Sequence, residues 1–325
     1  MSIRTISYRT LVAALGLIFS FSSAAISRAQ EPGGNISVRR PGRGPEKPVT
    51  IPVTIRVRQT NPPKEVQSVD LVVHEDGDEQ SSISIRSLAD APLSFAVLVQ
   101  DDLVSSVSNE IKTIAEFIRH LPPGSRVLVG YIRGGSINVR QRFTTDLNRA
   151  AKSLRIPYGV ASAATLDPYV QIREGLKRFE SQPLGRRGML VISDGLDLSH
   201  GDDPTSTIQS LDLHRAIVEA QRHSVAIYSI YSPSVISSSR GNSILTGSAQ
   251  SALQRLSNET GGRAFFQGMS APVSFDQFLR DIDSSLGRQI ALTYLSTHPE
   301  KGFHRIEVKA LVPDIEIRHP AGYTR

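Results

Sequence analysis

The chain has 325 residues, of which 39% are hydrophobic and 21% charged, and it contains no cysteine. This length is enough for one domain of about 200 residues with additional segments. The absence of cysteine excludes disulfides, thiol catalysis and zinc–thiolate sites. The formal net charge is +6, but most of the excess lies in residues 1–48. The sequence therefore offers no basic face or motif for nucleic-acid binding.

Residues 1–29 are typical of a secretory signal. Arg4 and Arg9 precede the apolar stretch LVAALGLIFSFSSAA, and the small residues of SRA precede Gln30. The apolar stretch is short for a membrane-spanning helix, although an uncleaved anchor is the alternative. We expect an exported protein, periplasmic or extracellular, with no stable membrane span after signal cleavage.

Segments at both ends of the remaining chain have the pattern of β-strands. Residues 30–48 are rich in Pro, Gly and Arg and are predicted to be a flexible leader. In residues 49–90, VTIPVTIRVRQ and SSISIRSL alternate apolar and polar side chains. Residues 289–325 repeat this pattern in RQIALTYLST and GFHRIEVKALV. We expect 289–325 to pack with 49–90 as one small antiparallel β unit.

Residues 91–288 alternate strands with helices. LSFAVLVQ and GMLVISDG contain near-continuous apolar runs, which indicate strands buried on both faces. Apolar periodicity predicts helices over 106–120, 146–154, 166–181, 211–223, 248–260 and 274–287. The predicted fold class is α/β, with a doubly wound, mostly parallel sheet flanked by helices.

Polar side chains gather where ligands bind in such folds, beyond the carboxyl ends of the strands. Asp101 and Ser105 follow the first buried strand, Thr165 precedes helix 166–181, and Asp194 follows the run MLVI. Hard divalent cations such as Mg²⁺ prefer oxygen ligands of this kind. Alternatively, the two carboxylates only structure loops, with Asp101 accepting N–H bonds at the start of helix 106–120.

These residues resemble the metal-ion-dependent adhesion site of the von Willebrand factor A family. That site has Asp-x-Ser-x-Ser after the first strand, a Thr from a later loop and an Asp in an SDG-like turn. The resemblance implies that Asp101, Ser105, Thr165 and Asp194 are metal ligands for Mg²⁺, or for Mn²⁺ or Ca²⁺. Leu103 stands where the family has its first Ser, so the site is degenerate. We expect Leu103→Ser to raise metal affinity.

The resemblance extends over about residues 50–325 through LVVHEDGDEQ, LQRLSNETGGRAFF, GFHRIEVKA and AGYTR. These segments are similar to exported von Willebrand A-related proteins known mainly from Acidobacteria. The wider family implies a non-enzymatic, adhesion-type module that binds an unknown protein partner, through a metal that bridges to the partner's acidic side chain. The alternatives are a metal-free scaffold, and a hydrolase or phosphotransfer enzyme using Asp101 and Asp194. No nucleophile elbow or phosphate loop supports an enzyme, so no catalytic residue is predicted.

Two further groups of polar residues are interpreted as structural. The loop GLDLSHGDD, residues 195–203, lacks the spacing of a calcium loop and is predicted to be a solvated acidic loop. The histidines are dispersed in sequence, so no zinc pair is predicted. His304 lies in an alternating strand and is expected at the surface.

Overall fold

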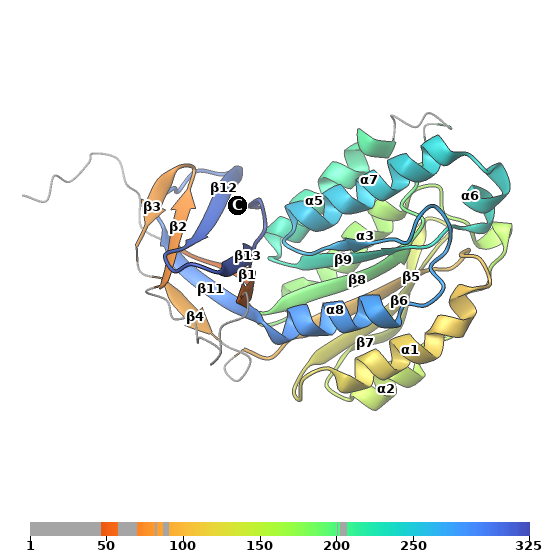
Figure 1. The fold of residues 1–325 in the computed structure, drawn as a ribbon, viewed down its shortest axis with the longest axis horizontal. Coiled ribbons are helices and arrows are strands. Elements are labelled where there is room, and N and C mark those ends of the chain that lie inside the picture. The colour runs from red at the N-terminus through yellow and green to blue at the C-terminus, as the bar shows by residue number, and fades with distance from the viewer. Residues whose placement is uncertain (1–46, 58–69, 82, 87–90, 200, 202–206) are drawn as a thin grey trace, which may run out of the picture. The chain divides into compact units, whose positions relative to one another are not determined.

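The computed structural model describes residues 47–57, 70–81, 83–86, 91–199, 201 and 207–325 (Figure 1). The predicted signal at 1–29 and leader at 30–48 lie outside these residues, except for Lys47 and Pro48. These two residues begin a strand rather than end a leader. Within the described ranges, no helix combines the length and apolarity needed to cross a membrane.

A six-stranded sheet forms the centre of the α/β part, in the order β10-β9-β8-β5-β6-β7. All neighbouring strands are parallel except β7, which pairs antiparallel with β6 through a hairpin. The predicted doubly wound, mostly parallel sheet is confirmed. The strands are β5 (Ser94–Gln100), β6 (Arg126–Arg133), β7 (Ser136–Thr144), β8 (Arg187–Ser193), β9 (Ala226–Tyr231) and β10 (Ala264–Phe265).

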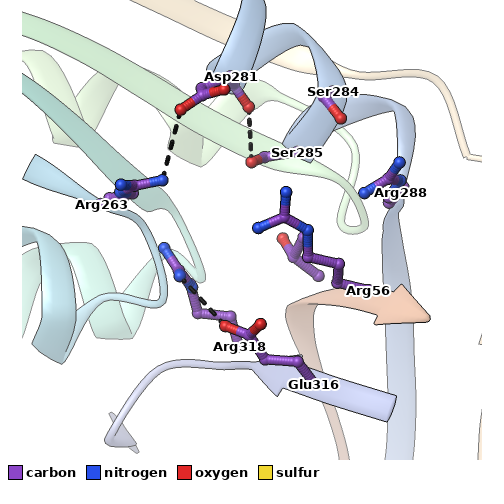
Figure 2. A pocket seen from close by; sticks show the side chains of 9 residues that line it. Arg56, Arg263, Asp281, Ser284, Ser285, Arg288, Glu316 and Arg318 are labelled. Carbon is purple, nitrogen blue, oxygen red and sulfur yellow. Dashed lines mark hydrogen bonds and ion pairs between the residues drawn. The ribbon is translucent and has the colours of Figure 1, made fainter. Parts of the chain in front are cut away.

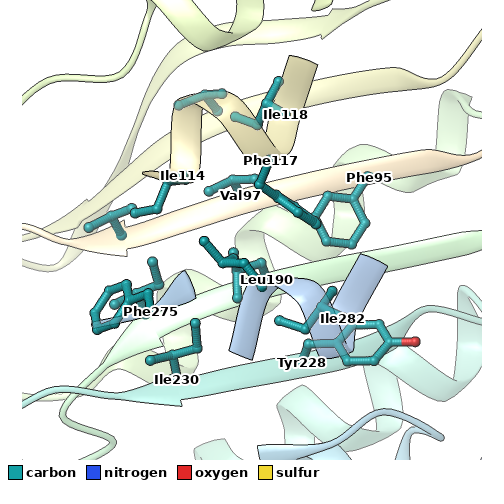
Figure 3. Close-up of a cluster of buried hydrophobic side chains, with 14 of the residues drawn as sticks. Phe95, Val97, Ile114, Phe117, Ile118, Leu190, Tyr228, Ile230, Phe275 and Ile282 are labelled. Carbon is teal, nitrogen blue, oxygen red and sulfur yellow. The ribbon is translucent and has the colours of Figure 1, made fainter. Parts of the chain in front are cut away.

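Helices cover both faces of this sheet, as Figure 1 shows. One layer packs on each face, because alternate strand residues point to opposite sides. In β5, Phe95 and Val97 join the core under the first layer, and Leu98 joins the core under the second. Figure 3 shows the first of these cores, including Phe117 against Phe95. The first layer contains α1 (Val107–His120), α2 (Leu147–Lys152) and α8 (Asp276–Gly287); the second contains α3 (Pro168–Leu176), α5 (Leu211–Arg222) and α7 (Ser243–Glu259).

Several predicted helix limits differ from the structure. The helix predicted over 166–181 is α3 followed by a 3-10 turn, η3 (Lys177–Ser181), and a second 3-10 turn, η2 (Ala161–Ala163), precedes it. The helix predicted from 248 begins at Ser243, where Asn242 caps α7 by accepting from two backbone N–H groups. The short helix α6 (Val235–Arg240) was not predicted.

Two glycines end α7. Gly261 has a φ of 82°, and its N–H donates to the carbonyl of Asn258. Gly262 N–H donates to the carbonyl of Ser257, which completes a Schellman motif. A Cβ on Gly262 would lie 1.9 Å from the carbonyl oxygen of Ile227, so only glycine allows this close approach to β9.

Strands from both ends of the chain form two further four-stranded sheets, in the orders β13-β1-β11-β4 and β14-β12-β2-β3. β1 pairs antiparallel with β11, and β2 pairs antiparallel with β12, which confirms the predicted β unit. Inward side chains of the two sheets share one apolar core. The domain limits 49–90, 91–288 and 289–325 stay predictions, because residues 42–325 form one compact unit. The strands are β1 (Lys47–Val57), β2 (Leu71–Glu75), β3 (Asp78–Gln80), β4 (Ser84–Arg86), β11 (Gln289–Ser296), β12 (Phe303–Ala310), β13 (Ile315–Arg318) and β14 (Gly322–Thr324).

Candidate functional site

Two of the predicted ligand residues follow neighbouring strands. Asp101 comes directly after β5, and Asp194 directly after β8, with which β5 pairs in parallel register. Both side chains are buried. Burial raises the pKa of Asp194 to about 6, and the charge of Asp102 contributes to the shift. The edge where these strands end therefore gathers carboxylates in a poorly solvated place.

An arginine neutralises Asp101. Both carboxylate oxygens of Asp101 accept from the Arg155 guanidinium at 2.7 Å, and the backbone N–H of Tyr158 donates to Oδ1 at 3.1 Å. The guanidinium also lies over the rings of Tyr131 and Tyr158, at 4.1 and 4.2 Å from their centroids. The prediction that Asp101 caps helix 106–120 is wrong, since these contacts hold the carboxylate instead.

Leu103 belongs to the core rather than to the ligand edge. Its side chain is fully buried in the apolar cluster under α1, together with Val107 and Ile114. A β-bridge to Ser234 fixes its backbone. A serine at this position would lose the apolar contacts that the leucine makes in this cluster. The geometry therefore gives no support to the expectation that Leu103→Ser raises metal affinity.

The remaining predicted ligands are engaged in local hydrogen bonds or point to solvent. The Thr165 hydroxyl lies 3.1 Å from the carbonyl oxygen of Asp167 and 3.3 Å from Oε1 of Gln171. Oδ1 of Asp194 accepts from the N–H of Leu196, and Ser105 is exposed. Thr165 and Asp194 thus stabilise the turns in which they stand.

A glutamine links the tips of β5 and β8. Oε1 of Gln100 accepts from the hydroxyl of Ser193 at 2.6 Å and from the N–H of Asp194 at 3.2 Å. Its Nε2 donates to Oδ1 of Asp102 at 2.9 Å. The amide thus links the turns that follow β5 and β8.

The arrangement can be tested for its fit to Mg²⁺, which demands near-octahedral oxygen coordination. Arg155 already supplies the positive charge that a metal would place beside Asp101. Leu103 contributes no oxygen, and Thr165 is turned to local partners. As arranged, these residues do not fit the ion. Metal binding by Asp101, Ser105, Thr165 and Asp194 stays a prediction, and the structure favours the metal-free alternative.

A second pair of buried carboxylates lies in the neighbouring loops. Asp167 caps α3 by accepting from the N–H of Tyr169 at 2.8 Å. Asp197 accepts from the N–H of Ser199 at 3.0 Å and from the hydroxyl of Ser210 at 2.6 Å. The predicted solvated loop is wrong for Asp197, which is 3% exposed. His200, Asp202 and Asp203 of that loop lie outside the described residues.

Asp167 gives a pH prediction. Burial raises its pKa to about 7, and the charge of Asp197 adds to the shift. The unfolded chain ionises this group near pH 4, so its contribution lowers wild-type stability as pH rises from about 4 to about 7. Asn retains the capping oxygen and stays neutral. We expect Asp167→Asn to match the wild type at low pH and to exceed it at about pH 8, by at most about 4 kcal/mol.

Urea unfolding at both pH values measures this difference. Asp146→Asn is the matched control, because Asp146 also caps a helix but is exposed. An equal pH dependence of the two variants would contradict a raised pKa at Asp167.

One histidine expectation is wrong. His304 is 4% exposed rather than at the surface. Its Nδ1 lies 2.8 Å from Oδ2 of Asp76, and its Nε2 lies 3.1 Å from the carbonyl oxygen of Glu300. Burial lowers the pKa of His304, but these hydrogen bonds outweigh burial and raise it overall. The ring of His298 is 6.1 Å away, so the fold brings together two histidines.

The loop next to Asp101 exposes large apolar side chains. We call residues 155–167 the tip loop, because Tyr158 and Gly159 donate backbone hydrogen bonds to Asp101 at the strand tip. Arg133 lies over the ring of Tyr158 at 4.6 Å. The exposed apolar residues of the tip loop are Ile156, Tyr158, Val160 and Leu166, which are 46–59% exposed.

An open basic pocket of about 40 Å³ lies elsewhere, between α8 and the strands β1 and β13 (Figure 2). Two of its arginines are paired, Arg263 with Asp281 and Arg318 with Glu316, each at 3.4 Å. Arg56 and Arg288 also line it. The pocket has a positive balance but contains no nucleophile with a supporting base.

No protein-family model and no curated protein matches the chain. Solved structures do match. An aerotolerance-related membrane protein from Bacteroides fragilis is 13% identical, with 60% of this chain and 98% of that chain covered and a TM-score of 0.41. A von Willebrand factor type A protein from Catenulispora acidiphila is 8% identical, with 88% and 75% covered and a TM-score of 0.43. Manganese-loaded TRAP protein from Plasmodium vivax is 9% identical, with 79% and 100% covered and a TM-score of 0.38.

Proposed function

We propose that this chain is an exported, non-enzymatic protein-binding module of the von Willebrand A type, and that its tip loop binds the partner without a bridging metal. The observation that carries the proposal is the exposure of Ile156, Tyr158, Val160 and Leu166 in one loop. Large apolar and aromatic side chains beside arginines are the composition of interface centres. The proposal of export rests on the sequence of residues 1–29 alone. The assignment to the Acidobacterial subfamily rests on sequence resemblance alone.

The charges around the tip loop suit an acidic partner segment. Arg155 donates to both oxygens of Asp101 and to the carbonyl of Ile156, which uses three of its five N–H donors. Its side chain remains 22% exposed. Together with Arg133 over Tyr158, it presents positive charge next to apolar surface. A partner carboxylate flanked by apolar residues would complement this loop, with the guanidinium in the role expected of a metal ion.

The enzymatic alternative is disfavoured by the state of the two carboxylates. A general base needs free lone pairs within reach of its substrate. Asp101 is paired with Arg155 and has no exposed surface. Asp194 is 4% exposed and accepts from the turn that follows it. A scaffold that binds nothing at the strand tips is the remaining alternative, and the next experiment separates it from binding.

The test compares retention of envelope proteins by three immobilised chains: wild type, Tyr158→Ala and Val273→Ala. Val273 is 89% exposed and lies in the α/β part outside the tip loop, so it is the matched control. We expect the wild type and Val273→Ala to retain the same proteins in similar amounts. The amount retained by Tyr158→Ala should be at least about 30-fold lower, as for an interface hot spot. We expect EDTA to leave retention unchanged. Equal retention by all three chains, or loss in EDTA, would contradict the proposal.

A further inference from the structure

A buried carboxylate stands at the end of the inward face of β2. The strand buries alternate residues, Leu71, Val73 and Glu75, and the first two belong to the apolar core of the β unit. Glu75 is 0% exposed. A charge removed from water in this way needs a compensating cation or a complete set of hydrogen bonds.

The hydrogen bonds of Glu75 are incomplete. Its Oε1 accepts from the hydroxyl of Ser296 at 2.9 Å and from the hydroxyl of Tyr323 at 2.7 Å. Its Oε2 has no hydrogen bond of good geometry among the described residues, although the buried hydroxyl of Tyr294 interacts with this carboxylate. The oxygen that faces the histidines is Oε1, which lies 3.8 Å from Nδ1 of His298 and 3.5 Å from Nδ1 of His304, so an ion there would share Oε1 with the two hydroxyls.

Two more potential metal ligands converge on Glu75. Glu75, Asp76 and His298 each offer one potential ligand atom, and these three atoms lie within 4.8 Å of one another. Nδ1 of His298 is 3.8 Å from Oε1 of Glu75. In a tetrahedral zinc site the ligand atoms are roughly 3.4 Å apart, given metal–ligand bonds of about 2.1 Å. Small side-chain rotations would bring these three groups to that spacing.

The neighbouring groups hold Asp76 in place. The N–H of Arg305 donates to Oδ1 of Asp76 at 2.8 Å, and Nδ1 of His304 lies 2.8 Å from Oδ2. Outer hydrogen bonds of this kind orient ligand carboxylates in metal sites. Asp78 adds a third carboxylate, 3.4 Å from Nε2 of His298. The cluster thus combines three acidic groups with two imidazoles.

We propose that Glu75, Asp76 and His298 bind a divalent transition-metal ion, with Zn²⁺ as the best fit to this mixed nitrogen and oxygen set. Imidazole favours zinc and its neighbours, whereas Mg²⁺ and Ca²⁺ take oxygen ligands. The ion would fasten the β2–β3 hairpin to the residues that follow β11. This site is built from β-unit residues and is independent of the tip loop and of the predicted ligands at the strand tips.

The experiment titrates the full chain with Zn²⁺ by calorimetry, and with Co²⁺ by visible absorption, which reports the ligand geometry. We expect one ion per chain and a melting temperature that rises by several degrees at about 100-fold excess over Kd. His298→Ala should weaken binding at least about 100-fold. His214→Ala is the control, because His214 is exposed on α5. If His298→Ala is not folded by circular dichroism, Asp76→Asn replaces it.

Two outcomes would overturn the proposal. One is the absence of binding and of any thermal shift with wild-type protein at millimolar Zn²⁺. The other is equal Zn²⁺ affinity in the wild type and the ligand variant.

Discussion

Replacement of Arg155 by alanine is expected to lower the free energy of unfolding by about 3–5 kcal/mol. The carboxylate of Asp101 is fully buried and would lose both guanidinium hydrogen bonds at once. Only the N–H donation from Tyr158 would remain to stabilise the charge. The loss of the stacked guanidinium would also open space between the rings of Tyr131 and Tyr158. Urea unfolding at neutral pH measures the change.

A double-mutant cycle isolates the ion pair from the packing. In Asp101→Asn the buried charge is gone, so adding Arg155→Ala should then cost clearly less than it does alone. Arg149→Ala is the control for an exposed arginine nearby, with an expected change within about 0.5 kcal/mol. A loss below about 1 kcal/mol in Arg155→Ala would show that Asp101 does not depend on this cation.

The central sheet could be predicted because its signal is local. The seven residues of β5 and the seven of β8 are buried, and both appear in the sequence as near-continuous apolar runs. Polar residues then follow where each strand ends. Parallel pairing alone places Asp101 and Asp194 at the same edge, so the gathering of carboxylates followed from strand order.

The chemistry of that edge could not be predicted, since it depends on contacts distant in sequence. Arg155 is 54 residues from Asp101, and nothing in the letters SLRIPYG marks it as the partner of a buried acid. Leu103 was interpreted from its place in a linear motif. Its backbone bridges to Ser234, a residue 131 positions later, and its side chain lies in the apolar core.

The buried cluster around Glu75 did leave a signal that was missed. In β12, His304 shares its buried face with Ile306 and Val308. Glu75 has the same relation to Leu71 and Val73 in β2. Strict period-two alternation therefore predicts both polar residues inside. The polar character of His304 alone suggests a surface position, whereas its place in the alternation predicts burial.

Replacement of Arg186 by methionine is expected to cost about 3–5 kcal/mol, although the new side chain fills similar apolar space. Arg186 is 1% exposed, and burial lowers its pKa to about 10. Its guanidinium donates to the carbonyl of Gln289 at 2.7 Å, to that of Ala91 at 3.4 Å, and to that of Leu286. These three carbonyls belong to the chain before β5, the end of α8 and the start of β11. Methionine would leave them without the donor that they share.

Arg186→Lys separates charge from geometry. An ammonium keeps the charge but cannot reproduce the planar fork that reaches three carbonyls, so we expect lysine to recover only part of the loss. Arg178→Met, at an exposed position, is the control for the substitution itself. Urea unfolding of the three variants decides between the two roles. If lysine restored full stability, a point charge would suffice, and the fork would not be what joins β11 and α8 to the central sheet.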